Sequence, residues 1–165
     1  MKHFHDWKLG TINVRTARED AKLEKVVSEI GRAGLSVCGL QEVRRIKNNS
    51  VLIKLDNEMQ YEVYWSGYST KRTHGVGIAI KIDRNIIIEE IKSINARLIV
   101  ADLNIHGCSV RIVNCYAPNE KNTTSSKDIF YHTLKEQLIT DGNRKTLCIG
   151  DFNATTSAWL EPPLA

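Results

Sequence analysis

Apolar and polar positions near the start of the chain predict a strand, a helix and a second strand. Residues 7–14 have the composition of a buried strand, and residues 20–33 carry apolar side chains at positions 21, 23, 26, 27, 30 and 33, close to helical spacing. The apolar run 35–40 is too short for a further helix and predicts a second strand. This strand leads directly into Gln41 and Glu42.

The middle of the chain contains a series of short apolar runs separated by turn residues. The runs predicted to be strands are 61–65, 76–82, 86–91, 98–105 and 110–116. Turn-forming pairs such as His74-Gly75 and His106-Gly107 lie between them. We therefore predict an antiparallel meander in this section.

The C-terminal part repeats the strand, helix, strand pattern. Residues 125–140 carry apolar side chains on one helical face, and the apolar run 146–150 leads into Asp151. Two strands joined by a crossover helix are parallel, so their carboxyl ends meet at one edge of a sheet, where α/β proteins bind ligands. The pattern thus predicts an α/β fold with Glu42 and Asp151 at such an edge.

Length and composition fit one globular domain over residues 1–165. Of these residues 42% are apolar, and the net charge of +4 permits a phosphate-rich partner without requiring one. No apolar run approaches the roughly 20 residues of a membrane helix, and residues 1–6 lack the features of a secretory signal. We expect no membrane association and an intracellular protein, nuclear or cytoplasmic. The four cysteines show no C-x-x-C spacing, which favours buried reduced thiols over zinc or disulfides.

Five polar residues lie at or just after the ends of predicted strands: Asn13, Glu42, Tyr116, Asp151 and Asn153. Taken singly, each is more often a solvated turn residue, a helix cap or the end of a strand. Their joint occurrence in one α/β architecture favours a functional site over five unrelated turns.

Five short motifs carry a resemblance to a known family. They are TINVR at 11–15, GLQE at 39–42, GVGIA at 75–79, NCYAP at 114–118 and IGDFNA at 149–154. In this order the chain resembles the endonuclease/exonuclease/phosphatase family. WSG at 65–67 and GDFNATTS at 150–157 are most similar to its non-LTR retrotransposon endonuclease and craniofacial-development-protein-2-like group.

The resemblance implies a four-layer α/β sandwich, with two mixed β-sheets face to face and helices outside. It implies Mg²⁺ (or Mn²⁺) on Glu42 with Asn13 beside it, and Asp151 as the base that orients and deprotonates the attacking water. Asn153 would donate to the scissile phosphate, and Tyr116 would hydrogen-bond in the same pocket. A divalent cation, aimed donors and a general base meet the needs of in-line attack on a phosphodiester.

The last part of the family pattern, a later Asp and a Ser-Asp-His, is not found here. None of the five histidines follows Asp151, and residues 158–165 do not continue the family pattern. We therefore expect a domain whose C-terminal strands are missing, with an atypical tail at 158–165 and an uncovered sheet edge.

Basic residues cluster in two loops that would rim this site. Arg44 and Arg45 lie in one loop, and Lys71 and Arg72 lie in the other. Such loops suit a phosphate backbone, while solvated surface loops are an equal alternative. His74, in the second loop, is interpreted as a turn residue rather than a ligand.

The resulting hypothesis is Mg²⁺-dependent phosphodiester hydrolysis by a DNA endonuclease of the retroelement type, with nucleic acid as partner and with the 165-residue chain inactive on its own. A phosphatase or phospholipase of the same family is one alternative. A non-catalytic remnant that serves as a binding module is the other, since the Asp-His part is lost. The oligomeric state is left open.

Overall fold

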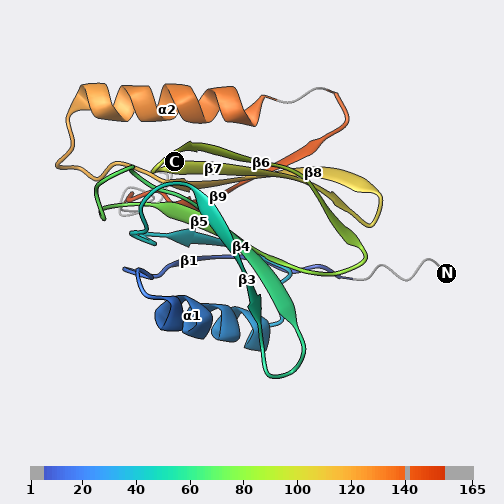
Figure 1. Cartoon of the computed structure of the whole chain (residues 1–165). Helices are drawn as coiled ribbons and strands as arrows, with labels where there is room; N and C mark the ends of the chain where they lie inside the picture. The colour runs from blue at the N-terminus through green and yellow to red at the C-terminus, as the bar shows by residue number, and fades with distance from the viewer. Residues whose placement is uncertain (1–5, 140–141, 155–165) are drawn as a thin grey trace, which may run out of the picture.

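The computed structural model describes residues 6–139 and 142–154, whose strands form two sheets lying face to face between two helices (Figure 1). The first sheet has the order β1-β2-β5-β4-β3, with β1 at Leu9–Asn13, β2 at Val37–Gln41, β3 at Asn49–Lys54, β4 at Gln60–Ser66 and β5 at Val76–Lys81. The second has the order β6-β7-β8-β9, with β6 at Ile86–Asn95, β7 at Leu98–Ile105, β8 at Cys108–Tyr116 and β9 at Lys145–Asp151. Each sheet is mixed, because β1 pairs with β2, and β8 with β9, in parallel.

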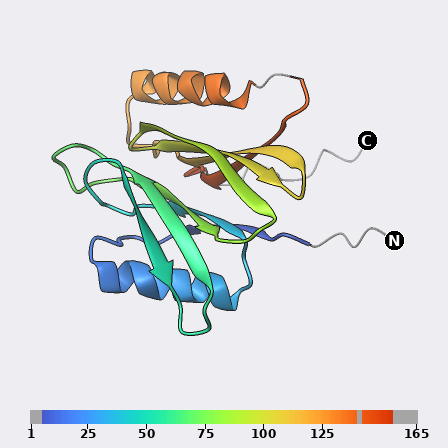
Figure 2. The same ribbon diagram turned by 45° about the vertical axis from the view of Figure 1, so that its right-hand side comes forward.

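One helix covers the outer face of each sheet (Figure 2). The helices are α1 (Asp20–Arg32) and α2 (Thr124–Leu138). Leu23 and Val27 of α1 belong to the core on the first sheet, and Phe130 of α2 to the core on the second. A third apolar cluster, with Ile78 and Ile112 among its members, fills the space between the sheets. The four-layer α/β sandwich is therefore confirmed.

The N-terminal strand, helix and strand form as the sequence predicts. Helix α1 occupies the predicted range, and its buried residues recur every three or four positions. Gly34 follows the helix with a φ of 67°, a left-handed conformation that glycine adopts at low cost. The chain can therefore reverse there and return as β2, parallel to β1.

The middle section differs from the predicted single meander in two ways. Strand β3 was not predicted, because it is an edge strand whose side chains are mostly exposed and which buries only Ile53. The remaining strands are also divided between the sheets, with β3, β4 and β5 in the first and β6, β7 and β8 in the second. Strand β5 already pairs with β2 and β4, so β6 has to begin another sheet.

A buried polar link joins the two sheets. The Gln41 Nε2 donates to the Asn114 Oδ1 over 2.6 Å, and the Asn114 Nδ2 donates to the carbonyl oxygens of Leu40 (3.0 Å) and Gly77 (2.7 Å). Both side chains are fully buried, so these hydrogen bonds satisfy groups that water cannot reach. The link lies one residue before Glu42 and thus sets where the end of β2 stands relative to β8.

Three further expectations concern membrane helices, the cysteines and the C-terminal tail. No helix in the described part has the length and apolarity needed to cross a membrane. Cys38 and Cys115 are buried as predicted, and Cys148 is only half-buried. Cys108 is exposed because it is the first residue of β8, directly after a turn. The predicted atypical tail, 158–165, lies outside the described residues.

Candidate active site

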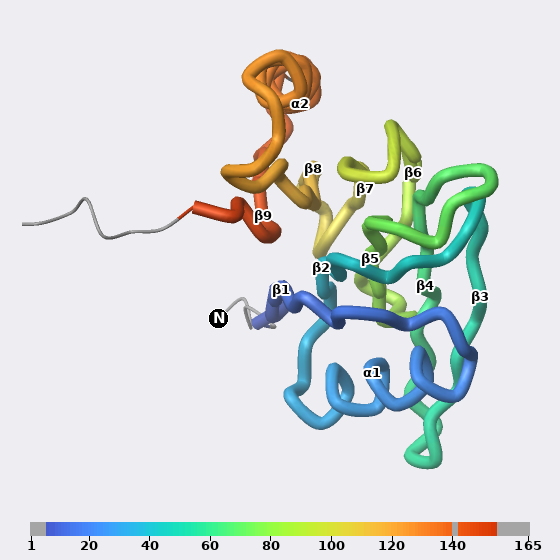
Figure 3. The backbone as a smooth tube through the Cα atoms, turned by 90° about the vertical axis from the view of Figure 1, so that its left-hand side faces the viewer, coloured from blue at the N-terminus to red at the C-terminus, as the bar shows by residue number. Residues whose placement is uncertain are grey.

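The five predicted site residues converge where β1, β2, β8 and β9 end. Asn13 is the last residue of β1, Tyr116 of β8 and Asp151 of β9, while Glu42 directly follows β2 and Asn153 lies two residues beyond β9. Strand β1 lies beside β9 across the two sheets (Figure 3). The two strand-helix-strand units therefore bring their carboxyl ends together, as the sequence predicted.

The amide of Asn13 joins the two acids. Its Nδ2 donates to the Glu42 Oε1 and to the Asp151 Oδ2, each over 2.9 Å. Its Oδ1 accepts from the backbone N–H of Arg15 over 2.9 Å, and this hydrogen bond fixes which end of the amide faces the carboxylates. Asn13 thus orients both acids through its nitrogen.

Glu42 is an ionised carboxylate held by three donors. Its Oε1 also accepts from the Tyr116 hydroxyl (3.2 Å), and its Oε2 accepts from the Arg44 Nη2 (2.7 Å). Burial alone would raise the pKa of Glu42, but the hydrogen bonds from Asn13, Arg44 and Tyr116, with the charge of Arg44, lower it below its ordinary value. Burial and the charge of Glu42 raise the pKa of Tyr116, so the phenol keeps its proton.

Asp151 and Asn153 form a turn at the end of β9. The backbone N–H of Asn153 donates to the Asp151 Oδ1 (2.9 Å), and the Asn153 Nδ2 donates to the Ala117 carbonyl oxygen (2.6 Å). Gly150, with a φ of 140°, is required before this turn because a Cβ there would overlap the carbonyl oxygen of Cys115. The Gly-Asp-Phe-Asn sequence therefore lets β9 approach β8 closely and fixes Asp151 by both carboxylate oxygens.

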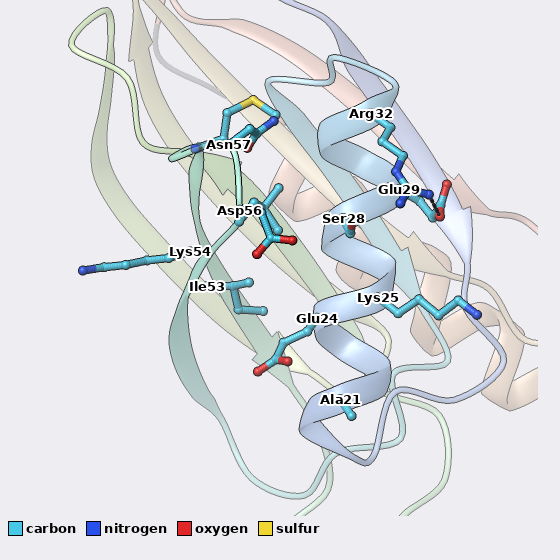
Figure 4. Close-up of a pocket in the computed structure, with 12 residues that line it drawn as sticks. Ala21, Glu24, Lys25, Ser28, Glu29, Arg32, Ile53, Lys54, Asp56 and Asn57 are labelled. Atoms are coloured by element: carbon cyan, nitrogen blue, oxygen red, sulfur yellow. Dashed lines mark hydrogen bonds and ion pairs between the residues drawn. The ribbon is translucent and has the colours of Figure 1, made fainter.

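A groove of 320 Å³ opens between the ends of β1 and β9 and is lined by Asn13, Asp151 and Asn153 among others. A larger groove of 510 Å³ lies between α1 and the β3–β4 turn (Figure 4). Its lining mixes acidic and basic side chains such as Glu24 and Lys25 and includes none of the five predicted site residues. Three of the five predicted site residues therefore line the smaller groove, and none lines the larger one.

Two side chains not predicted for the site lie against Tyr116. The His74 ring lies 5.8 Å from the Tyr116 ring, and the Arg97 guanidinium lies 5.2 Å from its centroid. Arg97 also donates to the carbonyl oxygens of Tyr116 (3.0 Å) and Ala117 (3.1 Å). His74 has a φ of 56°, in keeping with its predicted turn. Burial and the charge of Arg97 lower the pKa of His74, so the His74 ring is neutral at physiological pH.

The sequence hinted at only one of these two residues. His74 lies in a loop that the sequence analysis assigned to the rim of the site, and this assignment could have indicated a place near Tyr116. Arg97 is a single arginine in the turn between β6 and β7, and no motif marks it. Its role follows only from the packing of that turn against the end of β8.

The sequence profile of the Endonuclease/Exonuclease/phosphatase family matches residues 10–162, nearly the whole chain and all five motifs. The chain belongs to this family. A comparison with curated proteins gives no match. The description of this family names endonucleases, exonucleases and phosphatases.

Solved nucleases share the fold. An AP endonuclease from Archaeoglobus fulgidus has 22% identity and a TM-score of 0.58, with 90% of this chain and 58% of that one covered. The endonuclease domain of TRAS1, a telomere-specific non-LTR retrotransposon, has 14% identity, a TM-score of 0.61 and coverages of 93% and 62%. A 3'-5' exonuclease from Neisseria meningitidis has 20% identity, a TM-score of 0.56 and coverages of 87% and 56%. The chain thus spans less than two thirds of each of these structures.

The four basic residues predicted to bind nucleic acid fall into three environments in this family member. Arg44 is paired with Glu42. Arg45 donates to the Ala17 carbonyl and to Asp20, stacks on Trp65 and is only 11% exposed, so its guanidinium is held within the fold. Lys71 and Arg72 are exposed in the loop before His74, whose ring lies beside Tyr116.

The donor set of the family site resembles that of a magnesium site rather than of a structural zinc site. Among the described residues, no group of three or more His, Cys, Asp or Glu is arranged to hold a metal ion. Structural zinc needs four protein ligands, whereas Mg²⁺ commonly takes one or two carboxylates and keeps several waters. Glu42, a single carboxylate hydrogen-bonded to Asn13 of the groove lining, fits the second requirement.

Proposed function

We propose that this chain carries the metal ligand and the general base of a Mg²⁺-dependent DNA endonuclease of the retroelement type. The observation that carries the proposal is the Asn13 amide, which holds Glu42 and Asp151 at 2.9 Å each. A metal-binding carboxylate and a base placed on either side of one amide are the pair that hydrolysis of a phosphodiester requires. Family membership supports the class of reaction.

Each side chain has a defined task in this proposal. Glu42 would hold Mg²⁺, which when bound would supply positive charge against the charge that develops on the phosphate. Asp151, fixed through both oxygens, would orient the attacking water and accept its proton. Tyr116 would steady Glu42 through its hydroxyl, which stays protonated.

Asn13 and Asn153 are the proposed amide donors. Asn13 presents its nitrogen to the acids, so in this arrangement it orients Glu42, and it could ligate the ion only if its amide turned away from the Arg15 N–H. Asn153 uses one amide hydrogen on the Ala117 carbonyl and would direct the other towards the scissile phosphate. An Asn at this place is therefore a positioned donor rather than a simple turn former.

DNA is the substrate that the surface favours. Lys71 and Arg72 are exposed in the loop that leads to His74, whose ring lies beside Tyr116, and contacts to a continuous phosphate backbone require such exposed basic residues. The TRAS1 domain, with the same fold, is an endonuclease domain of a non-LTR retrotransposon. A DNA substrate is compatible with a nuclear or cytoplasmic protein, which we propose.

Nicking of supercoiled plasmid with Mg²⁺ tests the proposal. We expect residues 1–165 and their Asp151→Ala variant to match buffer alone, because the family's Ser-Asp-His donor is not in this sequence and loss of one aimed donor costs about a hundred- to a thousandfold. A version extended with a C-terminal segment from the family should nick, and its Asp151→Ala variant should not.

The outcomes separate the alternatives. Asp151-dependent nicking by residues 1–165 alone would contradict the expected inactivity. An extended version that folds and binds metal but never nicks would contradict the endonuclease proposal. The non-catalytic binding module would then be the remaining hypothesis. Hydrolysis of a small phosphate ester in place of plasmid would favour a phosphatase of the same family.

A further inference from the structure

Arg44 occupies the carboxylate that the proposed function assigns to the metal. Its Nη2 donates to the Glu42 Oε2 over 2.7 Å, the shortest of the hydrogen bonds that Glu42 accepts. Asn13 and Tyr116 both donate to the other oxygen, Oε1. The guanidinium is thus a positive charge on the oxygen that a divalent cation would also need.

A guanidinium and a divalent cation cannot share this position without cost. Both are attracted by Glu42, but they repel one another, and two positive charges a few ångströms apart interact appreciably even in water. Arg44 therefore opposes metal binding for as long as it stays on Glu42. Movement of the guanidinium away from Glu42 removes this opposition.

The structure allows that movement for Arg44 and not for its neighbour. The Arg44 side chain is 38% exposed, and its backbone N–H donates to the His74 carbonyl over 2.8 Å, so the residue stays at the site while its side chain can swing. Arg45, in contrast, is enclosed by Asp20 and Trp65. Of two adjacent arginines, one is part of the fold and the other can change partners.

We infer that Arg44 exchanges partners: it holds Glu42 in the metal-free chain and binds a phosphate group of the nucleic acid once Glu42 takes a divalent cation. The inference rests on the proposed function and adds a coupling between its two ligands. Arginine forms bidentate contacts with phosphate as readily as with carboxylate, so the exchange replaces one partner by an equivalent one. Metal and nucleic acid then strengthen each other's binding by the same factor.

Calorimetry with Mn²⁺ alone tests the first half of the exchange. We expect Arg44→Gln to bind Mn²⁺ about tenfold more tightly than the unmodified chain, because a repelling charge close to the ion is removed. Lys47→Gln is the matched control, since it removes an exposed charge from the same loop and should leave the Mn²⁺ affinity unchanged. Circular dichroism confirms that each variant is folded.

Fluorescence anisotropy with a labelled duplex oligonucleotide tests the second half. At constant ionic strength, Mg²⁺ should tighten DNA binding by the unmodified chain and should not do so for Arg44→Gln. Glu42→Gln frees the guanidinium without metal, so in EDTA it should bind DNA more tightly than the unmodified chain. This gain should vanish when Glu42→Gln is made in the Arg44→Gln background, whereas a general charge effect would persist there.

The results separate a failed inference from a failed function. If Glu42→Gln binds Mn²⁺ as well as the unmodified chain does, the proposed metal site is wrong. If Mn²⁺ binding depends on Glu42 but Arg44→Gln leaves it unchanged, only the exchange is wrong. If Arg44→Gln does not fold, the unmodified chain still tests the exchange of partners. A DNA affinity of the unmodified chain that does not respond to Mg²⁺ would overturn the exchange.

Discussion

At the scale of single residues, two of the proposed site residues have a left-handed backbone. Glu42 and Asn153 have φ values of 56° and 47°, in the left-handed region that residues with a side chain seldom adopt. Such conformations persist only where their surroundings hold them, and they concentrate at functional sites. Here the Glu42 side chain is held by Asn13, Tyr116 and Arg44, so the strained residue is also the most firmly bound carboxylate of the site.

Glu42 should dominate binding of Mg²⁺ or Mn²⁺ by the chain. We predict weak binding by the unmodified protein and loss of most of it in Glu42→Gln, because the amide keeps the size of the side chain but lacks the negative charge. Calorimetry measures both affinities. Glu24→Gln, which changes an exposed acid on α1, is the control and should bind as the unmodified chain does. Equal affinities for Glu42→Gln and the unmodified chain would refute the assignment.

The lowered pKa of Glu42 predicts a pH-dependent contribution to stability. A carboxyl whose folded pKa lies below its unfolded pKa stabilises the fold at higher pH, and this stabilisation is lost as the pH falls through the folded value. The melting temperature of the unmodified chain should therefore fall relative to that of Glu42→Gln as the pH drops from neutral into the acid range. A difference that stays constant with pH would contradict the prediction.

At the scale of elements, the crossing of β2 over β8 depends on a glycine. A Cβ at Gly39 would lie 2.6 Å from the Asn114 Oδ1 and 2.8 Å from the Ile149 Cδ1. Asn114 cannot give way easily, because its side chain is buried and bound to Gln41 and to two carbonyl oxygens. Gly39, the glycine of Gly-Leu-Gln-Glu, thus leaves the room that the Asn114 side chain needs to form the inter-sheet link.

Gly39→Ala should destabilise the fold by about 1 to 3 kcal/mol, the usual cost of overpacking a close-packed core. Chemical denaturation gives this value. The same substitution in an Asn114→Ala background should cost less, since the two nearest Asn114 atoms are then absent. An equal cost in both backgrounds would show that the strain at position 39 does not arise from Asn114.

At the scale of the whole molecule, the two strands that end at Asn13 and Asp151 also lie at sheet edges. Among the described residues, β1 ends the first sheet and β9 ends the second, and the side chains of Ile12, Leu147 and Phe152 are 45%, 38% and 39% exposed. Unpaired edges with apolar side chains invite pairing between molecules. The surface around the site therefore also favours association between molecules.

Residues 1–165 on their own should aggregate or melt over a broad range. Light scattering and calorimetry measure the two properties. Leu147→Lys, which places a charge on the β9 edge, should reduce aggregation more than Ile129→Lys, which changes an exposed position on α2. A sharp two-state melt of a monomer would contradict the prediction.

The amino-acid sequence by itself determined most of the elements and which residues were the candidates for the site. Hydrophobic periodicity is a local property that reports which face of a segment is buried, so α1, α2 and all strands but β3 could be predicted within a few residues of their observed bounds. Parallel pairing in both strand-helix-strand units followed from connection rules, and this was enough to place Glu42 and Asp151 each at the carboxyl end of a strand. The motifs then identified the family.

Tertiary structure alone decided how the strands are divided and which side chains meet. The predicted meander splits because β5 has no free side for β6, a fact of sheet order that no local pattern contains. Asn13 and Asp151 are 138 positions apart, and the amide that joins them is oriented by a backbone N–H. Arg44 and Arg45 are adjacent and chemically identical, yet one pairs with Glu42 and the other with Asp20. Their different partners follow from which strands and helices lie within reach of each guanidinium.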